Sequence, residues 1–107
     1  MSSGFTALDE LGIRIEDGLL KTLLNSIRIQ DIQRVEIQIG SRLGELLSFT
    51  HLTTMRLRLV VHGSFGVAVI AERKRFGLVW LHTKWAEKQG ALLGSAKRAI
   101  EALMSQS

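Results

Sequence analysis

Three histidines, His51, His62 and His82, are the only imidazole side chains of this sequence, which contains no cysteine. A histidine metal site needs ligands spaced so that they meet, for example two histidines four residues apart on a helix. These three residues lie in separate segments, and no such spacing connects them. The sequence therefore predicts no metal site and no cofactor. The lack of cysteine also excludes a disulfide framework and a thiolate nucleophile.

Motifs for catalysis and nucleotide binding are absent as well. The sequence contains neither the G-x-S-x-G elbow of serine hydrolases nor a glycine-rich phosphate loop of the two common types. The stretch Gly63-Ser64-Phe65-Gly66 is too short to hold phosphates and has the composition of a tight β-turn. We therefore expect no catalytic residues. An enzymatic function would need a pocket that cannot be recognised in the sequence.

Clustered cations are the remaining chemical signal. Residues 1–50 carry seven acids and five bases, a net charge of −2, whereas residues 51–107 carry three acids and nine bases, a net charge of +6. The densest cluster is Arg73, Lys74 and Arg75, and Arg56 and Arg58 lie on a nearby predicted strand. A single positive surface built from these five residues would bind phosphates or an acidic partner. The competing interpretation is a solvated loop that protects a strand end.

The elements that would position these cations are clearest in the second half of the chain. Apolar residues from Met55 to Val61 alternate with more polar ones, which predicts a strand that pairs in a hairpin with Val67–Ala71. Arg73, Lys74 and Arg75 would then lie in a solvated loop. Helical spacing of apolar residues predicts a C-terminal helix over residues 84–104. The preceding segment, Leu78–Thr83, fits either a fifth strand or an extension of that helix.

The first half gives weaker patterns. Asp17 occupies an N-cap position before leucines at helical spacing, which predicts a helix over residues 17–28. Residues 31–49 fit a helical stripe, but the alternation of Val35, Ile37 and Ile39 favours a strand, followed by an antiparallel return over Glu45–Leu52. We expect residues 1–6 to be disordered. The predicted fold is α+β, a single domain over residues 1–107, with an antiparallel sheet of four or five strands packed by an N-terminal and a C-terminal helix.

The stretch GVAVIAERKRFGLVWLHTKWAEK, residues 66–88, resembles the C-terminal part of roadblock-type domains, the dynein light chain roadblock family. In that family a buried apolar strand ends in a short loop, and a Gly-Leu-Val element opens the last helix. With the preceding hairpin strand the resemblance covers about a third of the chain, and the order of elements in the rest departs from the family pattern. The resemblance implies a dimer with a continuous sheet that serves as a non-catalytic platform for a small Ras-like GTPase or for motor and scaffold assemblies.

These patterns together favour an interaction module. The N-terminus lacks a basic region followed by an apolar one, and no run of about 18 apolar residues occurs, so we expect a cytoplasmic protein without a membrane partner. A mean hydropathy of +0.18 predicts apolar surface that a second copy covers in a homodimer. The predicted function is a non-catalytic, dimeric platform or regulator. The alternative is binding of nucleic acid or another anionic ligand by the basic second half, which the small number of aromatic residues disfavours.

Overall fold

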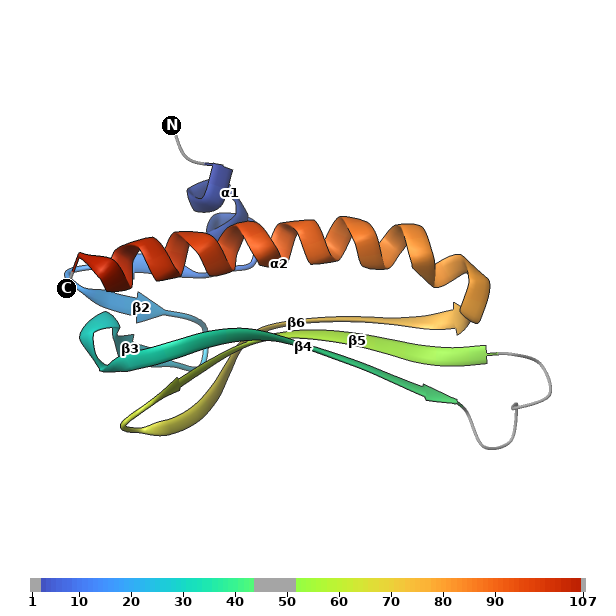
Figure 1. Cartoon of the computed structure of the whole chain (residues 1–107), viewed down its shortest axis with the longest axis horizontal. Coiled ribbons are helices and arrows are strands. Elements are labelled where there is room, and N and C mark those ends of the chain that lie inside the picture. Colours follow the sequence, from blue (N-terminus) through green and yellow to red (C-terminus); the bar gives the residue numbers. More distant parts are fainter. Residues whose placement is uncertain (1–2, 44–51, 107) are drawn as a thin grey trace.

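A long helix, α2 (His82–Ser105), lies along one face of a three-stranded antiparallel sheet (Figure 1). The sheet consists of β4 (Ile32–Leu43), β5 (Leu52–Gly63) and β6 (Gly66–Leu78), in that spatial order, with β5 in the centre. A single 3-10 turn, η3 (Val79–Leu81), connects β6 to α2. This computed structural model describes residues 3–43 and 52–106.

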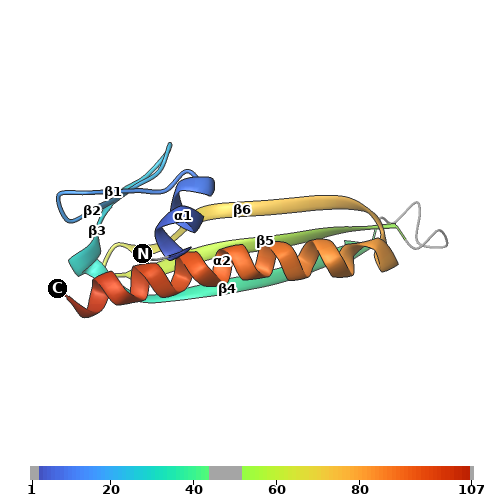
Figure 2. The same cartoon turned by 90° about the horizontal axis from the view of Figure 1, so that it is seen from above.

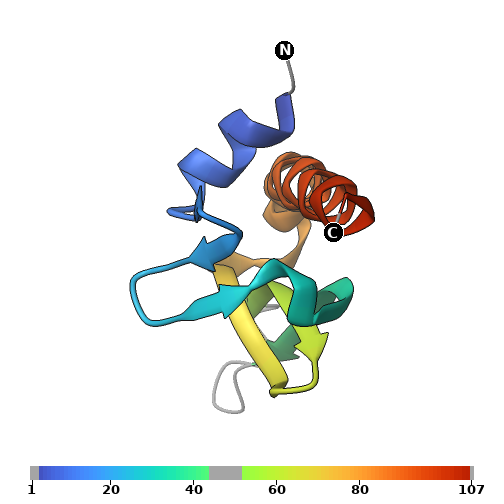
Figure 3. The ribbon, with the colours of Figure 1, turned by 90° about the vertical axis from the view of Figure 1, so that its left-hand side faces the viewer.

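A second, smaller sheet covers one end of the long strands. It contains β1 (Arg14–Glu16), β2 (Leu19–Lys21) and β3 (Ser26–Arg28), all antiparallel, and the 3-10 turn η1 (Ile29–Asp31) leads from it into β4. The chain begins with a short helix, α1 (Ser3–Glu10), which lies beside α2 in two perpendicular views (Figures 2 and 3). The second sheet and α1 thus lie at the same end of the molecule (Figure 2).

The core lies between α2 and the sheet face turned toward it. Alternate residues of β5, Leu57, Leu59 and Val61, point to this inner face because successive strand residues point to opposite faces. They form one cluster with buried residues of α2, the second sheet and α1, among them Leu93, Ala96, Ile100, Leu20, Ile27, Ala7 and Leu8. Burial of this set, at roughly 1.5–3 kcal/mol for each large side chain, fixes α2 on the sheet.

The predicted α+β class, the antiparallel pairing and the C-terminal helix are confirmed, but the single sheet of four or five strands is wrong. The strands divide into two sheets of three. The predicted helix over residues 17–28 is also wrong, because Asp17 and Gly18 have positive φ angles of 52° and 76° and form the two-residue turn of the β1–β2 hairpin. Such turns match the twist of paired strands.

The structure also tests the expectations for residues 1–6, 31–49 and 78–83. The sequence did not predict the helix at Ser3–Glu10, and residues 3–6, expected to be disordered, are helical because Ala7 and Leu8 anchor this helix in the core. The strand chosen for residues 31–49 is confirmed over β4, whereas the predicted return strand lies outside the described residues except for Leu52, where β5 begins. The segment 78–83 forms neither a separate strand nor a long extension of α2, because η3 intervenes.

Candidate functional site

The sheet face turned away from α2, which we call the outer face, collects most of the charged strand residues. Direct cross-strand pairs point to the same face, and two such pairs are Arg58 with Glu72 and Arg56 with Lys74. In β4, Arg34 and Glu36 point the same way, in register with His62 and Val60. The alternation of residues along β4, β5 and β6 therefore places these charged side chains on the outer face, whereas Leu57, Leu59 and Val61 of β5 point to the inner face.

The five predicted cations do not form one surface. Arg56, Arg58 and Lys74 lie together on the outer face, whereas Arg73 and Arg75 pair with Leu57 and Met55 and point to the inner face. The predicted solvated loop is wrong, because β6 continues through all three charged residues to Leu78 and stays paired with β5 throughout.

The side chain of Arg73 contacts another part of the fold and is not placed to bind a ligand on the outer face. Its Nη2 donates a hydrogen bond to the backbone carbonyl of Glu10, at the end of α1, over 3.2 Å. Its Nε is buried without a hydrogen-bond partner among the described residues. Arg73 thus ties β6 to the N-terminal helix.

Glu72 is the acid that the outer-face arginines share. Arg58 Nε donates to Glu72 Oε2 over 2.7 Å, and Arg56 Nε lies 3.8 Å from the same oxygen. The hydrogen bond from Arg58, with the charges of Arg58, Arg56 and Lys74, lowers the pKa of Glu72 below its ordinary value. One carboxylate therefore faces three cations, and Lys74 forms no ion pair with a described residue.

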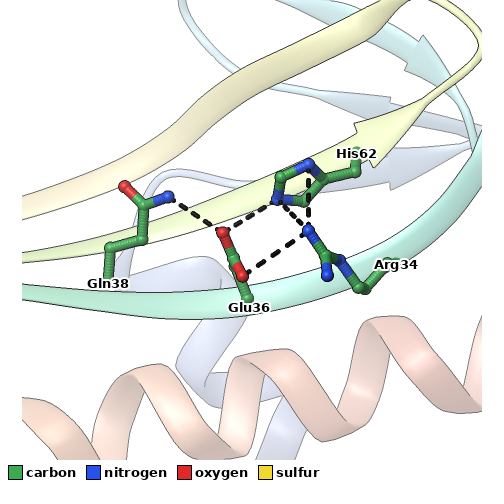
Figure 4. A network of polar contacts seen from close by, with 4 residues as sticks. All are labelled: Arg34, Glu36, Gln38 and His62. Atoms are coloured by element: carbon green, nitrogen blue, oxygen red, sulfur yellow. Dashed lines mark hydrogen bonds and ion pairs between the residues drawn. The ribbon is translucent and has the colours of Figure 1, made fainter.

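A second polar network occupies the outer face closer to the β5–β6 turn (Figure 4). Oε1 of Glu36 accepts a hydrogen bond from the amide of Gln38 over 2.9 Å and lies 2.9 Å from Nε2 of His62. Oε2 of Glu36 lies 3.7 Å from Nη2 of Arg34. The hydrogen bonds from Gln38 and His62 lower the pKa of Glu36. These side chains satisfy one another, which favours a structural role for this network.

An apolar groove of about 530 Å³ runs beside β6. Leu23 and Leu24, in the turn between β2 and β3, form one rim, and they are 98% and 89% exposed. The Arg58–Glu72 pair reaches the same groove, so it joins apolar surface to the charged outer face. The other apolar side chains of the lining belong to Leu11, Val69, Ile70 and Ala71, and the lining also includes Gly12, Thr22 and Asn25.

The turn that carries the two leucines is held by hydrogen bonds. The backbone N–H of Thr22 donates to the carbonyl of Asn25 over 2.8 Å, and the hydroxyl of Thr22 accepts from the N–H groups of Leu24 and Asn25. Sequence reasoning missed this site because it assigned both leucines to the buried face of a helix. The Asp17-Gly18 dipeptide was the signal that could have revealed a hairpin.

The two described histidines are not brought together. His62 belongs to the outer-face network, and His82 is buried at the start of α2, where its Nε2 donates to the backbone carbonyl of Thr53 over 3.2 Å. Within residues 3–43 and 52–106, no three His, Asp or Glu side chains gather as a metal site would require. His51 lies outside the described residues.

Comparison with protein-family models, curated proteins and solved structures finds no match to this chain. No helix among the residues that the structure describes is long and apolar enough to cross a bilayer. The candidate site consists of the groove and the adjoining charged residues of the outer face.

Proposed function

We propose that the chain is a non-catalytic protein-interaction module that binds an apolar, acidic segment of a partner protein in the groove beside β6. The observation that carries this proposal is the nearly complete exposure of Leu23 and Leu24 on a hydrogen-bonded turn. Covering a leucine side chain contributes roughly 1.5–3 kcal/mol. Because the turn is already ordered, little of that gain is lost in fixing it on binding.

The charge of the adjoining surface selects the partner. Arg56, Arg58 and Lys74 surround one acid, Glu72, so an acidic side chain entering from the groove would meet excess positive charge. Such charges raise association rates and exclude basic competitors. The module is proposed to act as a homodimeric platform or regulator, and a small Ras-like GTPase is the partner class that the roadblock resemblance implies.

A peptide-display selection on the purified chain tests the groove. We expect enriched peptides to combine large apolar residues with Asp or Glu, and the variant Leu23→Ser/Leu24→Ser to lose their binding. A matched control, Ile39→Ser, removes an exposed apolar side chain of β4 that lines no part of the groove and should retain it. Peptides that bind the double variant as well as the unaltered chain would contradict the proposal.

Nucleic-acid binding on the outer face is the second candidate function. Phe76, which is 58% exposed, pairs with Thr54 on that face, one alternate position from Lys74 and Arg56. An exposed aromatic beside cations is the arrangement on which single-stranded bases stack. Fluorescence anisotropy with labelled oligonucleotides at two salt concentrations tests it. Binding that Arg56→Glu/Lys74→Glu abolishes, while the groove variant retains it, would favour this function over peptide binding.

A further inference from the structure

The end of the molecule opposite the second sheet carries a cluster of exposed apolar side chains. We call it the apolar tip, and it comprises Phe76 near the end of β6 and the three residues of η3. Their exposed fractions are 58% for Phe76, 45% for Val79, 60% for Trp80 and 50% for Leu81. Three consecutive large apolar residues exposed on one turn are unusual for a soluble surface, where such side chains occur singly.

Among residues 3–43 and 52–106, the fold places this tip at one end. The molecule measures 50 × 31 × 21 Å, and the passage from β6 to α2 lies at one end of its longest axis (Figure 1). Because β6 enters η3 and α2 leaves it in nearly the opposite direction, the three side chains stand on a convex turn. A convex apolar end fits a flat, deformable surface better than it fits the groove of another protein.

Cations surround the apolar tip. Lys74 and Arg75 precede it on β6, and Lys84 and Lys88 follow it on the first turns of α2, while Glu87 is the one acid of residues 74–88. None of these four cations forms an ion pair with a described residue. Lys and Arg side chains near a lipid surface extend toward the headgroups and attract anionic lipids by about 1 kcal/mol each.

We propose that the apolar tip inserts into the surface of a membrane containing anionic phospholipid, with Trp80 and Leu81 at the headgroup level and the exposed Lys84 and Lys88 against the lipid phosphates. Trp is well suited to that position because its ring is apolar and its N–H is polar. Such a contact needs no spanning helix. It departs from the sequence expectation of no membrane partner, which rested on the absence of a long apolar run.

Vesicle binding measured with the complete chain tests the proposal. Trp85→Phe leaves Trp80 as the sole indole, since the sequence has two Trp residues. We expect its fluorescence to shift to shorter wavelength with vesicles of phosphatidylcholine mixed with phosphatidylserine, and to be quenched by brominated acyl chains. Phosphatidylcholine vesicles alone should bind more weakly, because they offer no counterpart to the cations.

Variants separate the two components of the contact. Trp80→Ser/Leu81→Ser should abolish sedimentation with both kinds of vesicle. Lys84→Gln/Lys88→Gln should weaken binding to the anionic vesicles about five-fold for each cation removed and leave binding to neutral vesicles unchanged. Leu23→Ser/Leu24→Ser removes the exposed leucines at the other end and serves as the matched control, with circular dichroism confirming that each variant is folded.

Two outcomes overturn the proposal. If the unaltered chain does not sediment with anionic vesicles, or if Trp80→Ser/Leu81→Ser sediments as well as it does, the tip is not a membrane contact. If the same double variant instead converts a dimer into a monomer without any lipid effect, the tip is an interface with a second copy. Peptide binding in the groove is measured separately, so either proposal can fail alone.

Discussion

Gly63, at the end of β5, is the most crowded of the described glycines. A Cβ atom at this position would overlap the backbone carbonyl oxygen of Asp31 and lie 2.8 Å from Cε1 of Phe65. The carbonyl belongs to η1 and cannot move without shifting the start of β4. The φ angle of Gly63 is not positive, so its backbone conformation does not require glycine. The requirement comes instead from the close approach of the two backbones.

Gly63→Ala should therefore lower the free energy of unfolding by about 1–3 kcal/mol, the usual cost of forcing extra atoms into a packed site. Urea denaturation followed by circular dichroism measures the change. Gly40→Ala is the matched control, because an added Cβ at Gly40 meets no atom within 4 Å, and it should be neutral or slightly stabilising. Equal midpoints for the two variants would show that Asp31 and Phe65 do not restrict position 63.

Glu36 should make stability depend on acid pH. Its pKa is lowered in the folded chain, so its contribution is complete above the pKa of the unfolded chain, about 4.3, and is lost as the pH falls through the lower folded value. We expect the unaltered chain to exceed Glu36→Gln in stability at pH 6, and the difference to vanish at strongly acid pH. A difference that stays constant from pH 6 to strongly acid pH would contradict this assignment.

Gln38→Ala tests the cause of that shift. The amide of Gln38 makes the largest contribution to it. Removing the amide should raise the pKa of Glu36 toward its ordinary value, as followed by NMR titration of the side-chain carboxyl. An unchanged titration curve would assign the shift to His62 and Arg34 instead.

Strand β6 places three consecutive charged residues on two faces of the sheet, Lys74 on the outer face and Arg73 and Arg75 on the inner face. Arg73→Glu should cost about 1–3 kcal/mol, because it removes the hydrogen bond to the carbonyl of Glu10 and places an acid beside that oxygen. Lys74→Glu should change stability by less than about 0.5 kcal/mol, since Lys74 is exposed on the outer face. Thermal unfolding of the two single variants measures their stabilities. Similar losses of stability would indicate that the face to which the charged side chain points does not matter.

The hairpin of β5 and β6 could be predicted because its apolar residues alternate over a long, uninterrupted stretch. Leu57, Leu59 and Val61 are in the core, as the period of two requires. The continuation of β6 could not be predicted in the same way. Its charged residues lie on an edge strand, where pairing with β5 supplies the backbone hydrogen bonds. Arg73 is held on the inner face by the carbonyl of Glu10, a contact between residues far apart in the sequence.

The second sheet was missed because helical spacing and a short hairpin coincide over residues 17–28. Leu20 and Ile27 are buried, but Leu23 and Leu24 between them are exposed, so the apolar stripe of the predicted helix does not exist. Strands of three residues are too short for alternation to be recognised. The groove depends on this second sheet, and the candidate site was therefore missed even though Arg58 was named.

The whole molecule is elongated, with a radius of gyration of 15.4 Å, against about 13 Å expected for a compact chain of this length. An elongated shape exposes more apolar surface than a sphere, which supports the proposed homodimer. Light scattering coupled to size exclusion should give about twice the chain mass of 11.9 kDa. Elution volume alone would overestimate the mass of such a shape. A scattering mass of one chain at high micromolar concentration would contradict dimerisation.

The packing of α1 against α2 joins the first helix of the chain to the last. An isolated helix of eight residues is unstable in water, so α1 acquires its structure only when α2 is present. During synthesis, roughly 70 residues separate the two helices, a delay of roughly 4–14 s at ordinary translation rates. Helix α1 thus folds only after α2 has been synthesised, and Ala7 and Leu8 remain accessible to chaperones until then.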